Sequence, residues 1–170
     1  TLRRRLDAAA RAGFPGASTV LVLLLLAAPL GLPAQAELQP ALVLGCVYFW
    51  SLFRPAAMPP ALVFVLGLML DLLGEGAIGV MVLILLIVHS VALRARRVFA
   101  QQGFLLVWLA FIGVAVGAAG LHWALSSILA FRLLPPSPEI FQAAIAAGVY
   151  PPLAVLLIAA HRGIAAPEQA

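Results

Sequence analysis

Long apolar runs separated by short polar breaks are the feature that most constrains this sequence. A helical crossing of a bilayer needs about 20 consecutive apolar residues, so a chain of 170 residues has room for about five or six crossings. The pattern predicts an all-α integral membrane protein, folded as a compact bundle of about six transmembrane helices. The predicted spans are 18–32, 38–53, 59–73, 78–93, 104–130 and 140–160.

The composition excludes a water-soluble globule. Hydrophobic residues make up 65% of the chain and charged residues 9%, and the mean hydropathy is +1.15. A soluble domain is usually about 45–50% apolar and about 25% charged, so this chain has too few polar side chains to cover a soluble surface. The alternating short strands of an outer-membrane barrel are not seen either.

The arginines predict how the bundle is oriented. All ten basic residues are arginine, and cytoplasmic loops of membrane proteins are enriched in basic residues. With both termini in the cytoplasm, only Arg132 falls outside, while Glu37, Glu75 and Glu139 fall in the outer loops. This alternation favours six crossings over five. We therefore expect a multi-pass protein of the bacterial inner membrane with both termini cytoplasmic.

The chain divides into three predicted parts: a basic cytoplasmic segment at 1–17, one membrane domain at 18–162 and a cytoplasmic tail at 163–170. Leucines at helical spacing in the first segment favour an amphipathic helix on the membrane surface, and a solvated basic tail is the alternative. Arginines, an apolar run and the sequence Ala34-Gln35-Ala36 also imitate a cleaved signal peptide; we expect the segment to be retained.

The third span is short and carries an acidic residue near its end. Fifteen residues reach about 22 Å at 1.5 Å per residue, less than the hydrocarbon core of about 30 Å. Gly67 and Asp71 lie four residues apart and share one helix face. Either Asp71 receives a partner's polar group or fixes a helix end, or it is an interfacial acid that caps a turn.

The fifth span carries a stripe of small residues. Gly113, Gly117 and Gly120 follow one another at helical spacing, and such a stripe lets another helix backbone come close. Two interpretations are open: packing inside the bundle, or contact with another chain, a homo-oligomer included.

Candidates for chemistry are few. Arg54 and Pro55 follow an aromatic cluster, where an arginine either snorkels to lipid headgroups or docks a partner. The three histidines lack metal-ligand spacing, Cys46 is the only cysteine, and neither a hydrolase turn nor a glycine-rich phosphate loop is present. A basic stripe with exposed aromatics, which nucleic acid would need, is absent too. We expect no enzyme activity, cofactor, metal or nucleic acid.

An ordered set of residues between 40 and 97 resembles the rod shape-determining protein MreD family. The set runs from Tyr48 through Arg54-Pro55 to Gly67-Leu68, Asp71-Leu72 and Gly79, in the order and spacing of the family's pattern. The resemblance implies a non-enzymatic scaffold of the cell-elongation and peptidoglycan-synthesis machinery. It also implies the partners MreC, MreB, RodA and a transpeptidase.

The same family is similar in fold to the substrate-binding subunits of energy-coupling-factor vitamin transporters, which supplies an alternative function. That alternative, a membrane subunit binding a small vitamin-like molecule, needs a cavity lined with polar groups and open to the outer face. The candidates for partner contact or for shaping the bundle are Arg54, Pro55, Gly67, Asp71, Gly79, Gly113, Gly117 and Gly120.

Overall fold

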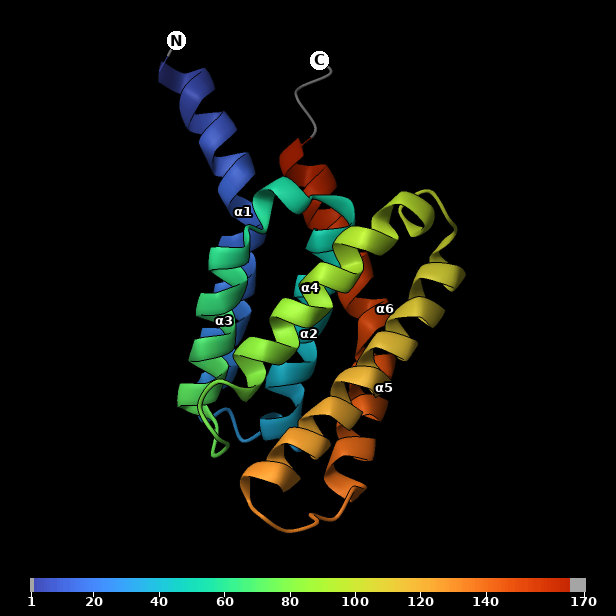
Figure 1. Cartoon of the computed structure of the whole chain (residues 1–170). Helices are drawn as coiled ribbons and strands as arrows, with labels where there is room; N and C mark the ends of the chain where they lie inside the picture. Colours follow the sequence, from blue (N-terminus) through green and yellow to red (C-terminus); the bar gives the residue numbers. More distant parts are fainter. Residues whose placement is uncertain (1, 166–170) are drawn as a thin grey trace.

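The computed structural model describes residues 2–165 and is built of helices (Figure 1). Within this range there is no β-strand, which confirms the predicted all-α class. The elements in chain order are α1 (Leu2–Ala27), α2 (Gln35–Phe53), the short 3₁₀ helix η1 (Pro55–Ala57), α3 (Pro60–Leu73), α4 (Val80–Phe99), α5 (Phe104–Leu129) and α6 (Ser137–Ala165).

Each predicted span corresponds to one α-helix, but two boundaries differ from expectation. The basic segment at 1–17 does not form a unit apart from the first span, because α1 runs without a break from Leu2 to Ala27. At the other end, residues 163–165 continue α6, and the rest of the predicted tail lies outside the described residues.

Four of these helices, α1, α2, α5 and α6, are long and apolar enough to cross a membrane. The third helix has 14 residues, about 21 Å at 1.5 Å per residue, as its sequence predicted. The fourth has 20 residues, but Arg94, Arg96 and Arg97 occupy its last turns. These two helices therefore depend on their neighbours more than the other four do.

The second helix is the centre of the bundle. It packs against α1, α4 and α6, and its residues from Val43 to Leu52 are all buried. A helix that is apolar on every side is stable only when other helices surround it. In Figure 1, α4 runs obliquely across the front from α3 toward α5, and α5 and α6 lie together at the right. Cys46 is fully buried in this core.

Prolines inside α1 and α6 do not end these helices. A helical proline leaves the carbonyl four residues earlier without its N–H donor, and here a side chain replaces that donor. The indole Nε1 of Trp108 donates to the Ala147 carbonyl at 2.9 Å. Likewise, Arg54 Nη1 donates to the Arg11 carbonyl, four residues before Pro15, at 3.2 Å.

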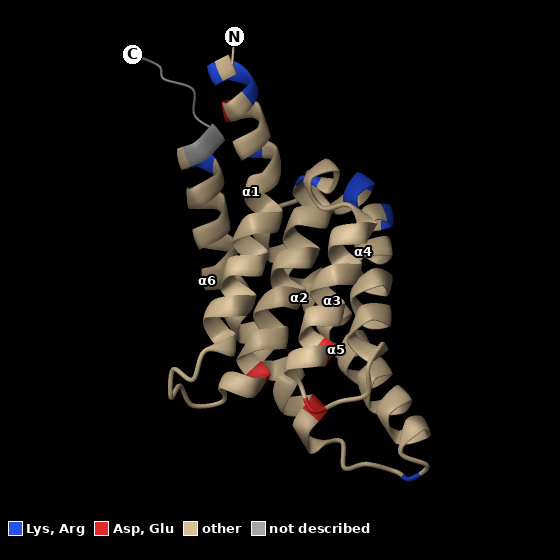
Figure 2. Cartoon of the chain, turned by 90° about the vertical axis from the view of Figure 1, so that its left-hand side faces the viewer, with Lys and Arg blue, Asp and Glu red and all other residues tan. Residues whose placement is uncertain are grey.

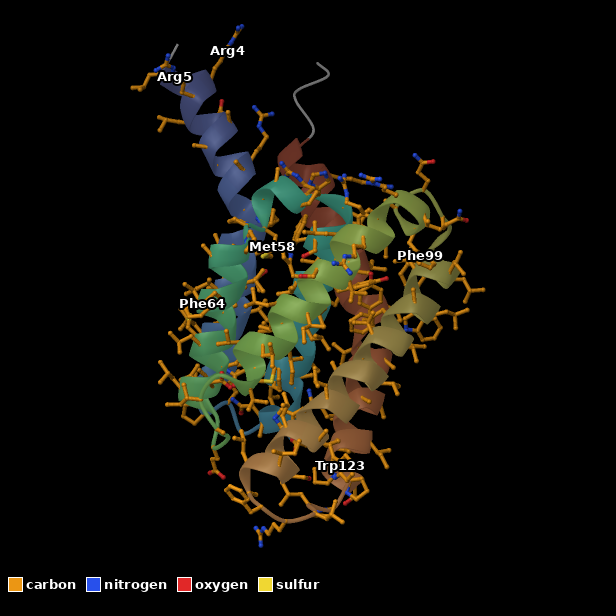
Figure 3. The ribbon with its side chains drawn as sticks, viewed as in Figure 1. Arg4, Arg5, Met58, Phe64, Phe99 and Trp123 are labelled. Carbon is orange, nitrogen blue, oxygen red and sulfur yellow. The ribbon has the colours of Figure 1, made fainter. Side chains whose placement is uncertain are left out.

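Charge separates toward the two ends of the bundle (Figure 2). We call one the arginine-rich end: it holds the start of α1 and the ends of α2, α4 and α6. The opposite, acidic end holds the connections α1–α2, α3–α4 and α5–α6, with Arg132 as its one basic residue. In Figure 3, Arg4 and Arg5 point away from the bundle at the start of α1. The arginines of the first end are Arg3, Arg4, Arg5, Arg11, Arg54, Arg94, Arg96, Arg97 and Arg162.

Candidate functional site

A close backbone contact between helices lies between α3 and α4. A Cβ placed on Gly67 would lie 2.5 Å from the Cα and 2.9 Å from the backbone nitrogen of Val82. Real Cβ atoms do not approach backbone this closely, and backbone cannot move aside as a flexible side chain can. Glycine at this position is what allows the two helices to touch.

The Asp71 side chain fixes the start of α4. One carboxylate oxygen accepts the N–H of Gly79 at 2.8 Å and that of Val82 at 3.4 Å, and the other accepts the N–H of Met81 at 3.1 Å. Negative charge at a helix N-terminus satisfies unpaired N–H groups and the helix dipole together. The carboxylate is 5% exposed, so we interpret Asp71 as the residue that fixes a helix end.

The turn before α4 requires a glycine, and Gly79 is the residue of the pattern found there. Gly79 has φ +102°, a backbone conformation that residues with a Cβ rarely adopt. It directly precedes Val80, the first residue of α4, and its N–H points to Asp71. Gly67, Asp71 and Gly79 thus act in one place, the α3–α4 junction.

The arginine-rich end has a second junction, centred on Arg54. Its Nη1 atom lies 3.2 Å from the Arg11 carbonyl of α1 and 3.4 Å from Nδ1 of His161 in α6. Pro55 then begins η1, and because proline has no N–H group, it leaves no unpaired backbone donor at the start of this helix. Arg54 therefore reaches back to join three helices, and it does more than snorkel to headgroups.

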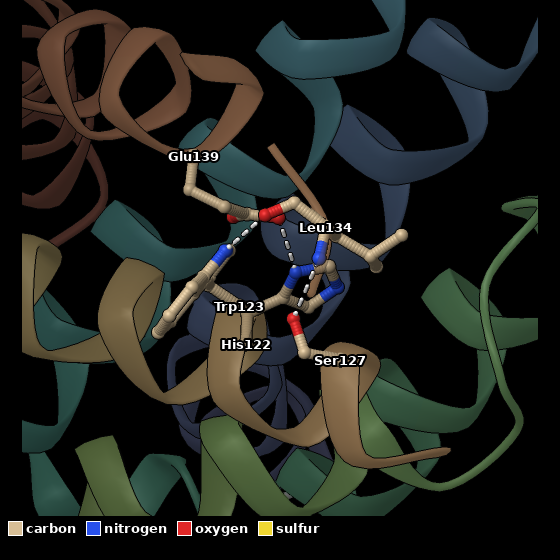
Figure 4. A network of polar contacts seen from close by, with 5 residues as sticks. All are labelled: His122, Trp123, Ser127, Leu134 and Glu139. Atoms are coloured by element: carbon tan, nitrogen blue, oxygen red, sulfur yellow. Dashed lines mark hydrogen bonds and ion pairs between the residues drawn. The ribbon is translucent and has the colours of Figure 1, made fainter. Parts of the chain in front are cut away.

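Polar side chains tie the α5–α6 connection at the acidic end (Figure 4). His122 Nδ1 lies 2.7 Å from a carboxylate oxygen of Glu139. The indole Nε1 of Trp123 donates to the Leu134 carbonyl at 2.8 Å, and the Leu134 N–H donates to Ser127 Oγ at 3.2 Å. These contacts hold the α5–α6 loop in place.

A pocket of about 280 Å³ opens among α2, the end of α3, the α3–α4 connection, α4, α5 and α6 at the acidic end. Its polar lining gathers side chains that are far apart in the sequence, while alanines of α5 and α6 supply much of its apolar wall. Sequence reasoning had placed several of these residues in separate outer loops, without predicting that they converge. The polar lining residues are Glu37, Gln39, Asp71, Glu75, His122, Glu139 and Gln142.

The glycine stripe of α5 lies on an open face. A Cβ added at Gly113, Gly117 or Gly120 would meet no atom within 4 Å. The helix packs inward through Val107, Phe111 and the other buried residues of α5 instead. Packing inside the bundle, one of the two interpretations of this stripe, is therefore wrong for these three glycines. Gly120 lines a groove between α5 and α6, whose other lining residues are mostly alanine and other apolar residues.

The sequence did not predict one buried polar pair, which joins α2 and α4. Ser51 Oγ and His89 Nδ1 lie 2.7 Å apart between α2 and α4. Within residues 2–165, His89 Nε2 has no hydrogen-bond partner, so the pair lacks the third group that orients the base in a catalytic triad. The same residues contain no cluster of three His, Cys, Asp or Glu side chains that could hold a metal ion.

The sequence matches the rod shape-determining protein MreD family over residues 13–159. This chain belongs to the MreD family. No curated protein and no solved structure matches it. Membership in this family identifies the chain as a membrane protein of the rod-shape system. The similarity in fold to transporter subunits stays a prediction.

The MreD-pattern residues fall at the two junctions described above. Gly67, Asp71 and Gly79 build the α3–α4 contact, and Arg54 with Pro55 builds the meeting point of α1, η1 and α6. In this MreD protein the pattern thus marks helix packing. The pocket and the open face of α5 lie largely outside the pattern, with Asp71 as the shared residue.

Proposed function

We propose that this protein is a non-enzymatic scaffold of the cell-elongation machinery, which binds a bitopic membrane protein such as MreC. Its family supplies the rod-shape system, in which MreB, RodA and a transpeptidase are the further partners we expect. By the positive-inside rule, the arginine-rich end faces the cytoplasm and the acidic end faces outward across the inner membrane. Both termini then lie in the cytoplasm.

The pocket at the acidic end is the observation that carries this proposal. Glu37, Glu75 and Glu139 line it, and no arginine other than Arg132 lies at this end. A bitopic partner emerges from the membrane at this level, where a basic side chain just after its transmembrane helix meets complementary charge. Electrostatic complementarity of this kind sets the register and orientation of a complex.

The open face of α5 supplies the surface for the partner's transmembrane helix. Gly113, Gly117 and Gly120 leave its backbone uncovered, and helices in lipid associate mainly through dispersion contacts that small residues permit. Glu139 and Ala119 line both the pocket and the groove between α5 and α6. A helix on this face would therefore end beside the pocket, so one partner can engage both.

A complementation experiment tests the proposal. Depleting the protein in a rod-shaped host is expected to give round cells, and wild-type protein restores rods. The variant with Glu37→Gln and Glu75→Gln should restore them poorly and recover less partner on purification. Asp7→Asn serves as the matched control, because it removes a carboxylate at the opposite end. Full restoration of rods and normal partner recovery by the pocket variant would contradict the proposal.

A second pair of variants tests the helix face. Gly113→Leu with Gly117→Leu should abolish partner recovery while the protein stays folded, since no atom lies within 4 Å of either added Cβ. Val65→Leu, on an exposed residue of α3 that lines neither the pocket nor the groove, should leave recovery unchanged. Equal recovery with both variants would exclude this face as the docking surface.

The alternative function, binding of a vitamin-like molecule by a transporter subunit, would use the same pocket. Its volume of about 280 Å³ lies at the lower limit of small-molecule sites, which span about 300–1,000 Å³. The family points to cell shape instead. Native mass spectrometry of the purified protein separates the two: a stoichiometric metabolite, with no partner chain recovered, would favour the transporter.

A further inference from the structure

The junction at Arg54 holds more hydrogen-bond donors than acceptors. A guanidinium carries five N–H donors, yet the two side-chain hydrogen bonds of Arg54 within the described chain both involve Nη1. The described residues contain one ion pair, His122 with Glu139 at the far end. Arg54 is half-buried, and among the described residues it has no anionic partner of the kind that a partly desolvated arginine favours.

An aromatic cluster next to Arg54 contains a second hydrogen-bond donor without an acceptor in the described chain, the indole N–H of Trp50. The Trp50 ring contacts Phe14 of α1 and His161 of α6, with centroid distances of 6.2 and 6.1 Å. Trp50 is fully buried, and its indole Nε1 has no hydrogen-bond partner among residues 2–165. A buried donor without an acceptor costs about 1–3 kcal/mol, so an acceptor group would stabilise this junction.

Two more arginines flank the same place. Arg11 supplies the carbonyl that Arg54 contacts, and its own Nε donates to the Asp7 carbonyl at 3.2 Å. Arg162 directly follows His161 on α6 and is exposed. Asp7 is the single acidic residue at this end within the described chain, against nine arginines. The apolar helix α2 ends here at Phe53, and the ends of membrane-spanning helices lie near the lipid headgroups.

We propose that the junction of α1, η1 and α6 binds the phosphate group of an anionic phospholipid, with Arg54 as the main ligand and Arg11 and Arg162 beside it. Guanidinium groups bind phosphate through paired, charge-assisted hydrogen bonds, and basic pockets between transmembrane helices bind anionic headgroups. The bound lipid joins the ends of α1 and α6, which flank α2. The stability of the bundle then depends on the lipid composition of that leaflet.

The test uses the full chain in neutral detergent, titrated with phosphatidylglycerol or with phosphatidylcholine. Native mass spectrometry counts bound lipids, and the unfolding temperature is followed in parallel. Phosphatidylglycerol should bind and raise the unfolding temperature, while phosphatidylcholine should do neither. Because Arg54 contacts the backbone of Arg11, Arg11→Gln with Arg162→Gln keeps the helix contacts and should weaken phosphatidylglycerol binding roughly 30-fold.

Two further variants separate a built site from general positive charge. Arg54→Lys keeps the charge but loses the planar fork, and should also weaken binding. Arg96→Gln with Arg97→Gln removes the same charge at the end of α4 and should weaken it by about 3-fold or less, since exposed charges away from the site are screened.

Three results would overturn the proposal. The first is equal weakening by the two double variants, which indicates general charge attraction. The second is equal binding of phosphatidylcholine. The third is a shift in unfolding temperature produced by inorganic phosphate alone, equal to that of phosphatidylglycerol, which assigns the site to a soluble anion.

Discussion

The α3–α4 and α5–α6 hairpins use glycine in opposite ways. In the first, the backbone of Val82 occupies the space that a side chain on Gly67 would need, and the Asp71 carboxylate accepts hydrogen bonds from the N–H groups at the start of α4. In the second, three glycines face open space, and the hairpin is held by polar contacts of Trp108, His122 and Trp123. A glycine in a membrane helix therefore marks a contact only when a neighbour fills the space.

The largest effect is expected at the closed hairpin. Gly67→Leu should prevent folding, because even a Cβ would lie 2.5 Å from a backbone atom and overpacking costs about 1–3 kcal/mol or more where nothing can yield. The matched change Gly117→Leu should give a folded protein. Size-exclusion chromatography and thermal unfolding followed by circular dichroism measure the difference. Similar elution and unfolding of the two variants would refute the contrast between the hairpins.

A smaller effect is expected when the capping carboxylate is neutralised. Asp71→Asn leaves one carbonyl oxygen to serve three N–H groups, so the free energy of unfolding should fall by about 2–3 kcal/mol. Glu75→Gln, four residues later and exposed, is the control and should change it little. Denaturant unfolding in mixed micelles gives both values. An unchanged Asp71→Asn protein would show that the backbone alone positions α4.

In the open hairpin, Trp108→Phe should cost about 1 kcal/mol. The change removes the donor that serves the Ala147 carbonyl, which Pro151 has left without a backbone partner. Leu105→Ala, on an exposed residue of the same helix, is a control that removes no such bond. If Trp108→Phe unfolds no earlier than Leu105→Ala, the indole hydrogen bond does not support α6 at its prolines.

The smallest effect should have the opposite sign. Gly117→Ala adds a methyl group where no atom lies within 4 Å, and alanine is the better helix former by up to about 1 kcal/mol. We expect a slightly higher unfolding temperature, whereas Gly67→Ala should lower it. If the purified Gly117→Ala protein unfolds at a lower temperature than the wild type, another chain, such as a second copy of this protein, contacts this face.

Much of the fold follows from sequence periodicity alone. The apolar runs predicted where each helix lies, since a bilayer requires long stretches without charge, and the short length of α3 was visible as well. The spacing of Gly67 and Asp71 placed both on one face. What the spacing could not show is which backbone meets that face, because the partner, Val82, lies on a different helix.

The sequence by itself determined that this chain is a helical membrane protein of the MreD family, and that its charges divide between its two ends. These properties depend on composition and local order, which every conformation of the chain shares. Only the tertiary structure decided at which glycines a neighbouring helix fills the space beside the backbone and at which glycines that space is open. It also decided that Arg54 replaces the N–H donor missing at Pro15. The convergence of acidic residues from separate loops on one pocket likewise depends on it. Those properties depend on distances between helices, and such distances exist only once the helices have packed.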